Sequence, residues 1–471
     1  MSSIQNKKRV FISTSIIIIF LLLLWAFIPN DSYQSIIQFR NINSVEVTQD
    51  LLSEHCSVPF PGKPLIQYAV MVDAGSSGSR VHIYKFNFCK EEPELENEVF
   101  HMLEPGLSSF DDPERAADSL EELFQIAVDN VPLKLQRCTP IAVKATAGLR
   151  LLGQEKSKVI LDTVRRRLET QYLFPISSVE IMDGKDEGVY AWITVNYLLG
   201  NFKSSSLSRS VATFDLGGAS TQIVFEPEFP ISAGKGIKPG DHLYELDYAN
   251  HRYNLYQHSY LGYGLKEARK MIKTKVIELW QDRLPFGQIY HPCLPENYTE
   301  VISWKNESIS TDIQLIGTGA GHAACRGIIE KIFNKEKVCP LAPCSFDGIY
   351  QPPLEETFID RDLYVFSFFY DLTQPLGLPQ EFTVREFGEL ANRVCSRDIE
   401  ALKHVPNALH ILKESPDYCL DLTYTHALLR IGYDISPERI VRTAKKINNA
   451  ETGWCLGASI AMLNNNQLCR V

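Results

Sequence analysis

The sequence contains one short pattern twice: a strand-like apolar run reaches an aspartate, small residues follow, and another strand begins at once. The copies are Asp73–Arg80, flanked by strand-like residues 66–72 and 81–86, and Asp215–Gln222, followed by residues 223–225. Glycines permit a tight turn, and successive backbone amides and serine hydroxyls can then face one concavity. One such loop alone is typical of an ordinary turn, whereas two matching copies predict a pair of phosphate-binding hairpins.

A pair of such hairpins has an electrostatic consequence. If they face each other, Asp73 and Asp215 approach the same phosphate, and three negative groups cannot share a cleft without a divalent cation. The sequence therefore predicts a Ca²⁺ or Mg²⁺ site. Such hard ions take oxygen ligands and often keep water, so the aspartates act on the cation directly or through water molecules.

Strands and helices alternate around these hairpins, which indicates an α/β fold. Asp111–Glu114 is expected to open an amphipathic helix carrying Leu120, Leu123, Phe124 and Ala127. Glu187 precedes the apolar helical run 190–199, where the helix dipole favours a charged carboxylate that suits a general base. The plain alternative is a first-turn glutamate without a catalytic role.

The two hairpins resemble those of the actin, Hsp70 and sugar kinase superfamily. That resemblance implies an RNase H-like fold of two lobes with the active site in the cleft between them. Residues from about 65 to 465 also resemble the apyrase family, the nucleoside triphosphate diphosphohydrolases, in five stretches that occur in the family's order. They are Asp73–Arg80, Lys144–Arg150, Asp183–Trp192, Asp215–Gln222 and Gly453–Gly457. The most similar subgroup has a single N-terminal hydrophobic segment and acts mainly on UDP, GDP and other nucleoside diphosphates in the endoplasmic reticulum and Golgi.

The resemblance also implies residue roles. Glu187 becomes the general base, and Ser220 and Gln222 hold the attacking water. Thr146 joins Asp73 and Asp215 around the cation through water, although it is equally suited to cap a turn. Trp454 and Tyr370 pack against the nucleobase, the alternative for Trp454 being an ordinary core residue. The phosphate-binding residues are Ser76, Ser77, Gly78, Ser79, Gly217, Gly218 and Ala219.

The N-terminus indicates a membrane anchor. Three basic residues, Lys7 to Arg9, precede an apolar run at 10–28 that is long enough to cross most of a bilayer. A cleaved secretory signal is the alternative, but no small-residue cleavage site follows. The positive-inside rule makes the chain a type II membrane protein with its remainder in the secretory lumen, and a secreted or cell-surface form stays open. The expected division is a cytoplasmic tail at 1–9, anchor at 10–28, stem at 29–64, first lobe at 65–208 completed by 445–471, and second lobe at 209–444.

Cysteine usage agrees with a lumenal compartment. The chain has 11 cysteines and no CxxC pair, so disulfides are favoured over a zinc site, and an odd count leaves at least one thiol unpaired. Pairs that could close loops are Cys339 with Cys344, Cys293 with Cys325, and Cys395 with Cys419. Glycosylation sequons begin at Asn297 and Asn306, and a third at Asn30 is expected to stay unused near the membrane.

Other classes of function lack support. The net charge of −10 argues against nucleic acid as a partner. No HExxH or GxSxG pattern is present, and the glycine-rich Gly317–His322 lacks P-loop spacing and is expected to be a turn before a helix. We therefore expect metal-dependent hydrolysis of nucleoside diphosphates to the monophosphate and phosphate, supporting glycosylation. The alternatives are a broad-specificity ecto-apyrase, an exopolyphosphatase-like enzyme, and a nucleotide-gated binding protein.

Overall fold

A computed structural model describes residues 51–202, 209–229, 236–249, 251–280, 287–305, 310–465 and 468–469. The predicted anchor at 10–28 lies outside these residues. Among the helices that are described, none combines the length and the apolar character needed to cross a membrane.

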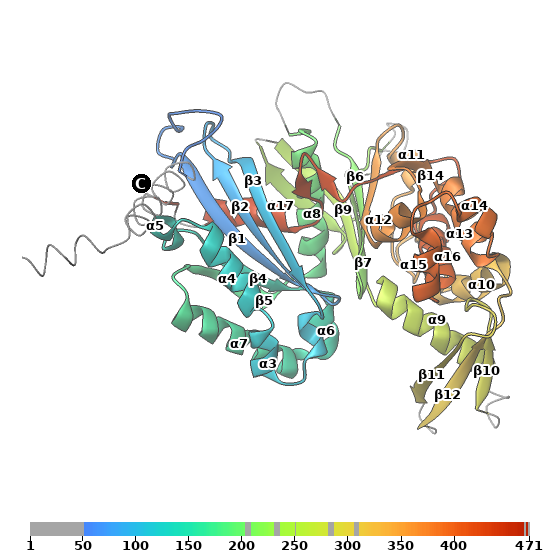
Figure 1. The fold of residues 1–471 in the computed structure, drawn as a ribbon. Helices are drawn as coiled ribbons and strands as arrows, with labels where there is room; N and C mark the ends of the chain where they lie inside the picture. Colours follow the sequence, from blue (N-terminus) through green and yellow to red (C-terminus); the bar gives the residue numbers. More distant parts are fainter. Residues whose placement is uncertain are drawn as a thin grey trace, which may run out of the picture.

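The first sheet contains the first predicted hairpin. Its strands are β1 (Ile66–Ala74), β2 (Ser79–Asn87), β3 (Glu94–Leu103), β4 (Ile141–Ala145) and β5 (Ile176–Ile181), in the order β3-β2-β1-β4-β5 (Figure 1). β1 and β2 pair antiparallel, and β4 runs parallel to β1. The strands predicted on both sides of Asp73–Arg80 are confirmed, each slightly longer than expected.

Both faces of this sheet are covered, which explains why β1 is apolar at nearly every position. Val70 and Val72 face a core formed with α3 (Pro113–Asp118), α4 (Glu121–Asn130), α5 (Leu133–Gln136), α6 (Ala147–Leu152) and α7 (Gln154–Gln171). The alternate residues Ala69 and Met71 face a second core, which contains α8 (Gly184–Leu198) and the last helix, α17 (Cys455–Asn465). The period of two along β1 thus divides its side chains between two helical layers.

The single helix predicted after Asp111–Glu114 is wrong in one respect, because the structure divides it into α3 and α4. The Ser119 hydroxyl donates to the Ala116 carbonyl at 2.7 Å, and the Leu120 amide bonds the Ala117 carbonyl at 3.1 Å. These bonds tighten the backbone and end α3. The apolar residues expected on the helix are nevertheless buried, namely Leu120, Leu123, Phe124 and Ala127.

The second sheet repeats this arrangement around the other hairpin. Its order is β14-β15-β13-β6-β7-β9-β8, with bounds β14 (Glu381–Thr383), β15 (Ile440–Thr443), β13 (Leu363–Ser367), β6 (Ala212–Leu216), β7 (Ser220–Phe225), β9 (His251–Leu261) and β8 (Leu243–Tyr248). β6 and β7 pair antiparallel, and β13 runs parallel to β6, as β4 does beside β1. The α/β architecture is confirmed.

The remaining elements surround the second sheet. A small sheet of β10 (Gln288–His291), β12 (Ser310–Gly317) and β11 (Thr299–Lys305) projects from it beyond α9 (Leu265–Leu279) (Figure 1). The glycine-rich stretch expected to be a turn before a helix runs from the last residue of β12, Gly317, to the first residue of α10, His322, so the connection is confirmed but is shorter than expected. The other helices are α10 (His322–Ile329), α11 (Leu354–Thr357), α12 (Phe368–Thr373), α13 (Val384–Cys395), α14 (Ile399–Leu402), α15 (Ala408–Glu414) and α16 (Tyr418–Ala427), and the short strands β16 (Lys446–Ile447) and β17 (Ala450–Glu451) precede α17.

The three predicted disulfide pairs form, together with two that the sequence did not suggest, Cys56–Cys89 and Cys138–Cys469. Cys455 keeps a free thiol and is buried at the start of α17. Of the sequon asparagines, Asn297 is exposed, whereas Asn306 and Asn30 lie outside the described residues.

Candidate active site

The two hairpins place their aspartates in equivalent positions. Asp73 is the next-to-last residue of β1 and lies opposite Arg80 on β2. Asp215 is the next-to-last residue of β6 and lies opposite Gln222 on β7. Both aspartate residues are buried, each with 8% of its surface exposed. The same register thus gives one aspartate a cationic neighbour and the other an amide.

The loops that follow the aspartates meet each other. A Cβ added to Gly218 would lie 2.6 Å from both the Ser76 and the Ser77 hydroxyl oxygen, so only glycine permits this approach. Between the loops is a cleft of about 240 Å³. The predicted site residues that line it are Asp73, Ser76, Ser77, Thr146, Glu187, Asp215, Gly217, Gly218, Tyr370 and Trp454.

The second loop is held by the first turn of α9. The amides of Leu265 and Lys266 donate to the carbonyls of Gly217 and Gly218 at 2.9 and 2.8 Å. Because the carbonyl and the amide of a trans peptide point in opposite directions, the amide hydrogen of Gly218, which lines the cleft, is directed away from α9. An anionic ligand in the cleft could accept a hydrogen bond from this amide.

The aspartates have the properties of a cation site. Asp73 Oδ1 and Asp215 Oδ1 are buried and have no hydrogen-bond partner. Burial raises the pKa of Asp73. Arg80, which donates to Asp73 Oδ2 at 3.0 Å, opposes this effect and lowers the pKa. Burial also raises the pKa of Asp215 to about 6, opposed by the Ser367 hydroxyl and reinforced by Asp73. Unpartnered carboxylate oxygens on one cleft are the hard ligands that Ca²⁺ or Mg²⁺ takes, so either ion would fit here with water completing its shell.

Glu187 lies in the first turn of α8, whose N-cap is Asp183. We expected the helix dipole to favour its charged form, but that expectation is overturned by burial. Burial raises the pKa of Glu187 to about 8, with Arg150 lowering it and Asp215 and Asp73 raising it further. Local helix position is therefore the weaker influence on this carboxylate.

Arg150, at the end of α6, donates from Nη2 to Glu187 Oε2. Only the ionised carboxylate can take a proton, so the rate should rise as pH passes the Glu187 pKa. In Arg150→Ala the neighbouring cation is lost, and we expect this rise to move to higher pH. The profile of kcat against pH at saturating divalent cation measures the shift, with Arg150→Lys as the charge-retaining control. An unmoved profile in Arg150→Ala would show that the ion pair does not govern the base.

Ser220 and Gln222 are each 2% exposed, and neither is among the residues that line the cleft. Gln222 packs against the backbone beside the predicted base, because a Cβ added to Gly188 would lie 3.2 Å from Gln222 Cβ. Gln222 Nε2 donates to Ser220 Oγ at 2.8 Å. The three residues predicted to handle the attacking water are therefore neighbours.

The remaining predicted residues lie around this centre. Gly78 packs against the end of β3, and Ser79 and Ala219 are buried in their hairpins rather than lining the cleft. Thr146 lines the cleft just before α6 without capping that helix through its side chain. The sequence left open whether Trp454 is a core residue or lines the nucleotide site. The structure shows a residue that is 4% exposed in the core beside α17 and that also lines the cleft.

Sequence reasoning assigned no role to Arg80, Arg150 or Ser367. The two arginines stand inside stretches that resemble the apyrase family, so their positive charge next to predicted carboxylate sites was an available signal. Ser367 is the last residue of β13 and belongs to no recognisable pattern, and its closeness to Asp215 arises only because β13 pairs with β6.

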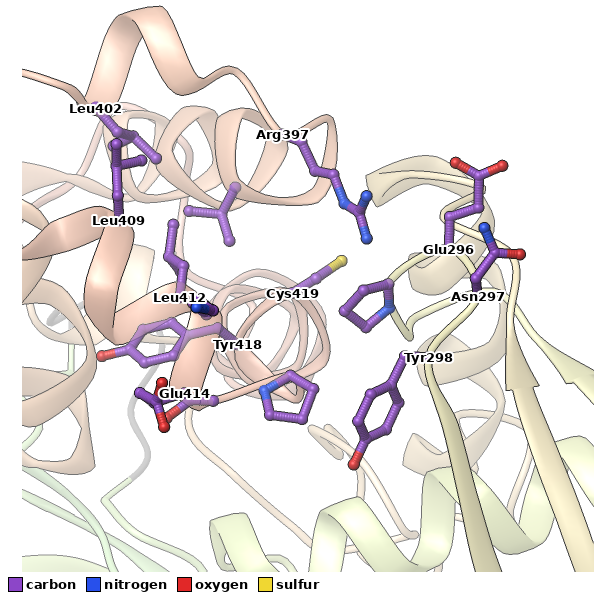
Figure 2. A pocket seen from close by; sticks show the side chains of 15 residues that line it. Glu296, Asn297, Tyr298, Arg397, Leu402, Leu409, Leu412, Glu414, Tyr418 and Cys419 are labelled. Atoms are coloured by element: carbon purple, nitrogen blue, oxygen red, sulfur yellow. The ribbon is translucent and has the colours of Figure 1, made fainter.

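A larger hollow, of about 800 Å³, lies between the turn before β11 and helices α13, α15 and α16 (Figure 2). Figure 2 labels several of the residues that line it, among them Tyr298, Leu409, Leu412 and Tyr418. None of the predicted site residues lines it. The larger hollow is therefore not the one that the predicted site residues line.

Comparison with known proteins gives consistent findings. Residues 63–470 match the GDA1/CD39 (nucleoside phosphatase) family. The chain is 48% identical over 445 residues to a guanosine-diphosphatase of Schizosaccharomyces pombe, covering 91% of this chain and 80% of the relative. It is 34% identical to the human nucleoside diphosphate phosphatase ENTPD5, covering 88% and 91%. A solved nucleoside triphosphate hydrolase from Neospora caninum has a similar fold, with TM-score 0.59 at 15% identity, over 91% of this chain and 96% of that one.

Proposed function

Because the chain belongs to the GDA1/CD39 (nucleoside phosphatase) family, we propose that its cleft hydrolyses nucleoside diphosphates, GDP and UDP among them, to the monophosphate and phosphate. The observation that carries this proposal is the meeting of the two hairpins, with Asp73 and Asp215 buried at one cleft and Glu187 beside them. The names of the relatives, guanosine-diphosphatase and nucleoside diphosphate phosphatase, support the choice of substrate.

The reaction is a single displacement by water. Glu187 takes a proton from a water held by Ser220 and Gln222, and the oxygen of that water forms a bond to the terminal phosphorus. The bond from that phosphorus to the bridging oxygen breaks, and the nucleoside monophosphate leaves with the bonding electron pair. Amides of both loops and the serine hydroxyls donate to the phosphoryl oxygens as their charge rises.

We further propose that Asp73 and Asp215, with Thr146 through water, hold Ca²⁺ or Mg²⁺. When bound, this ion neutralises charge on the phosphate oxygens. Two buried carboxylate oxygens without partners support this assignment. Trp454 and Tyr370, which line the same cleft, are proposed to contact the nucleobase.

For the cell, we propose a type II protein anchored by residues 10–28, with this cleft in the Golgi or endoplasmic reticulum lumen. There it would remove the GDP or UDP that glycosyltransferases release. The apolar run and the disulfides support a secretory location.

Phosphate release by the full-length protein from a panel of GDP, UDP, ADP, the matching triphosphates and polyphosphate tests the proposal. We expect multiple turnovers with GDP and UDP, and loss of activity when EDTA is added. Faster hydrolysis of triphosphates would favour a broad-specificity apyrase, and preference for polyphosphate would favour an exopolyphosphatase. Turnover too slow to measure would favour a nucleotide-gated binding protein.

A further inference from the structure

Gln222 has a second hydrogen-bond partner besides Ser220. Its Nε2 donates to Ser259 Oγ on β9 at 3.0 Å, as well as to Ser220 Oγ at 2.8 Å. A carboxamide nitrogen carries two hydrogens, so both are engaged by these two hydroxyls. The acceptor Oε1 is then the part of the amide left to bind a water molecule.

The backbone supports this contact. Gln222 and Ser259 are directly paired across the antiparallel β7–β9 ladder, so their side chains lie on the same face of the sheet. Gln222 is almost fully buried and Ser259 is half-buried. The register of the two strands, rather than a flexible loop, therefore sets the distance between them.

Ser259 also contacts the helix that carries the predicted base. A Cβ added to Gly184, the first residue of α8, would lie 2.5 Å from Ser259 Oγ and 2.3 Å from Arg150 Nη1. One turn further along α8, Gly188 packs against Gln222. The first turn of α8, with Glu187 between these two glycines, thus rests on the Gln222–Ser259 pair.

We infer that Ser259 is a positioning residue for the attacking water, an inference that rests on the proposed function of the cleft. Ser259 fixes the Gln222 amide so that Oε1 accepts one hydrogen of the water while Glu187 takes the other. A lone pair of the water oxygen then faces the phosphorus. Without the Ser259 hydroxyl, one amide hydrogen loses its acceptor and the amide is free to turn.

The inference predicts a loss in catalysis without a loss in substrate binding, because Ser259 does not line the phosphate cleft. For Ser259→Ala we expect kcat to fall about tenfold, as for the loss of one hydrogen bond, with KM within about twofold of wild type. Asn254→Ala is the matched control, since Asn254 is an exposed residue on the same strand. The control should leave both constants and the melting temperature unchanged.

The decisive experiment is a double-mutant cycle on the full-length protein with GDP, using Ser259→Ala, Gln222→Ala and the double variant. If Ser259 acts through Gln222, the double variant should be no slower than Gln222→Ala alone. Losses that multiply, or a Ser259→Ala kcat within twofold of wild type while Gln222→Ala is impaired, would overturn the inference. A Gln222→Ala variant with full activity would instead count against the proposed water site. If the wild-type protein does not hydrolyse GDP, that result would count against the proposed function itself.

Discussion

Glu187→Gln should lower kcat for GDP by about 10² to 10⁴, the usual contribution of a general base. Glutamine has nearly the same shape and can still accept the Arg150 hydrogen bond, so packing at the start of α8 is preserved. What it loses is the ability to take a proton from water. Phosphate release under saturating substrate and cation measures the loss, and thermal unfolding by circular dichroism measures whether the fold is retained.

Glu180→Gln provides the control, because Glu180 is an exposed carboxylate on β5 that pairs with Lys144. It should remain as active as wild type. A Glu187→Gln variant that turns over at a near-normal rate would refute the assignment of Glu187 as the base, even if the cleft is the active site.

Asp215→Asn is expected to have the second large effect. Loss of one of two carboxylates should weaken cation binding and lower the rate by roughly 10²-fold or more, since a bound metal contributes several kcal/mol to such reactions. Titration calorimetry with Ca²⁺ and Mg²⁺ reads the binding directly, and phosphate release as a function of cation concentration reads its effect on turnover. Asp312→Asn is the matched control, because Asp312 is an exposed aspartate on β12.

The same variant should behave differently when stability is measured in EDTA. The folded pKa of Asp215 is raised to about 6, chiefly by burial, whereas the carboxyl of the unfolded chain ionises at lower pH. Above pH 6 Asp215 is ionised in both states, and its buried charge destabilises the folded cation-free protein relative to the unfolded chain. Asparagine removes this cost, and the melting temperature at pH 7.5 should equal or exceed that of wild type. A marked decrease would show that the Asp215 charge is satisfied within the protein, contrary to the cation assignment.

The repeated motif was sufficient to predict the two hairpins, because residues within one hairpin are fixed by local register. That Asp73 and Asp215 line one cleft followed only on the condition that the two hairpins face each other. Contacts between segments that are distant in the sequence could not be predicted from it. The Arg150–Glu187 ion pair depends on how α6 and α8 pack, and Ser259 reaches Gln222 only through the pairing of β7 with β9. The raised pKa of Glu187 had the same origin, since burial is a property of the assembled cleft and not of its helix.

The chain's own length has a consequence for how it is made. The core between β1 and α8 is completed by α17, whose Leu456, Ile460 and Leu463 belong to the same buried cluster as Ala69 and Met71. Figure 1 shows α17, in red, beside the strands of the N-terminal sheet. At about 5 to 20 residues per second, roughly 20 to 80 s of synthesis separate β1 from α17. The N-terminal sheet therefore emerges from the ribosome long before the helix that shields one of its faces. During that interval this apolar face of the sheet is uncovered, and it can be buried only once the helix at 455–465 has been translated.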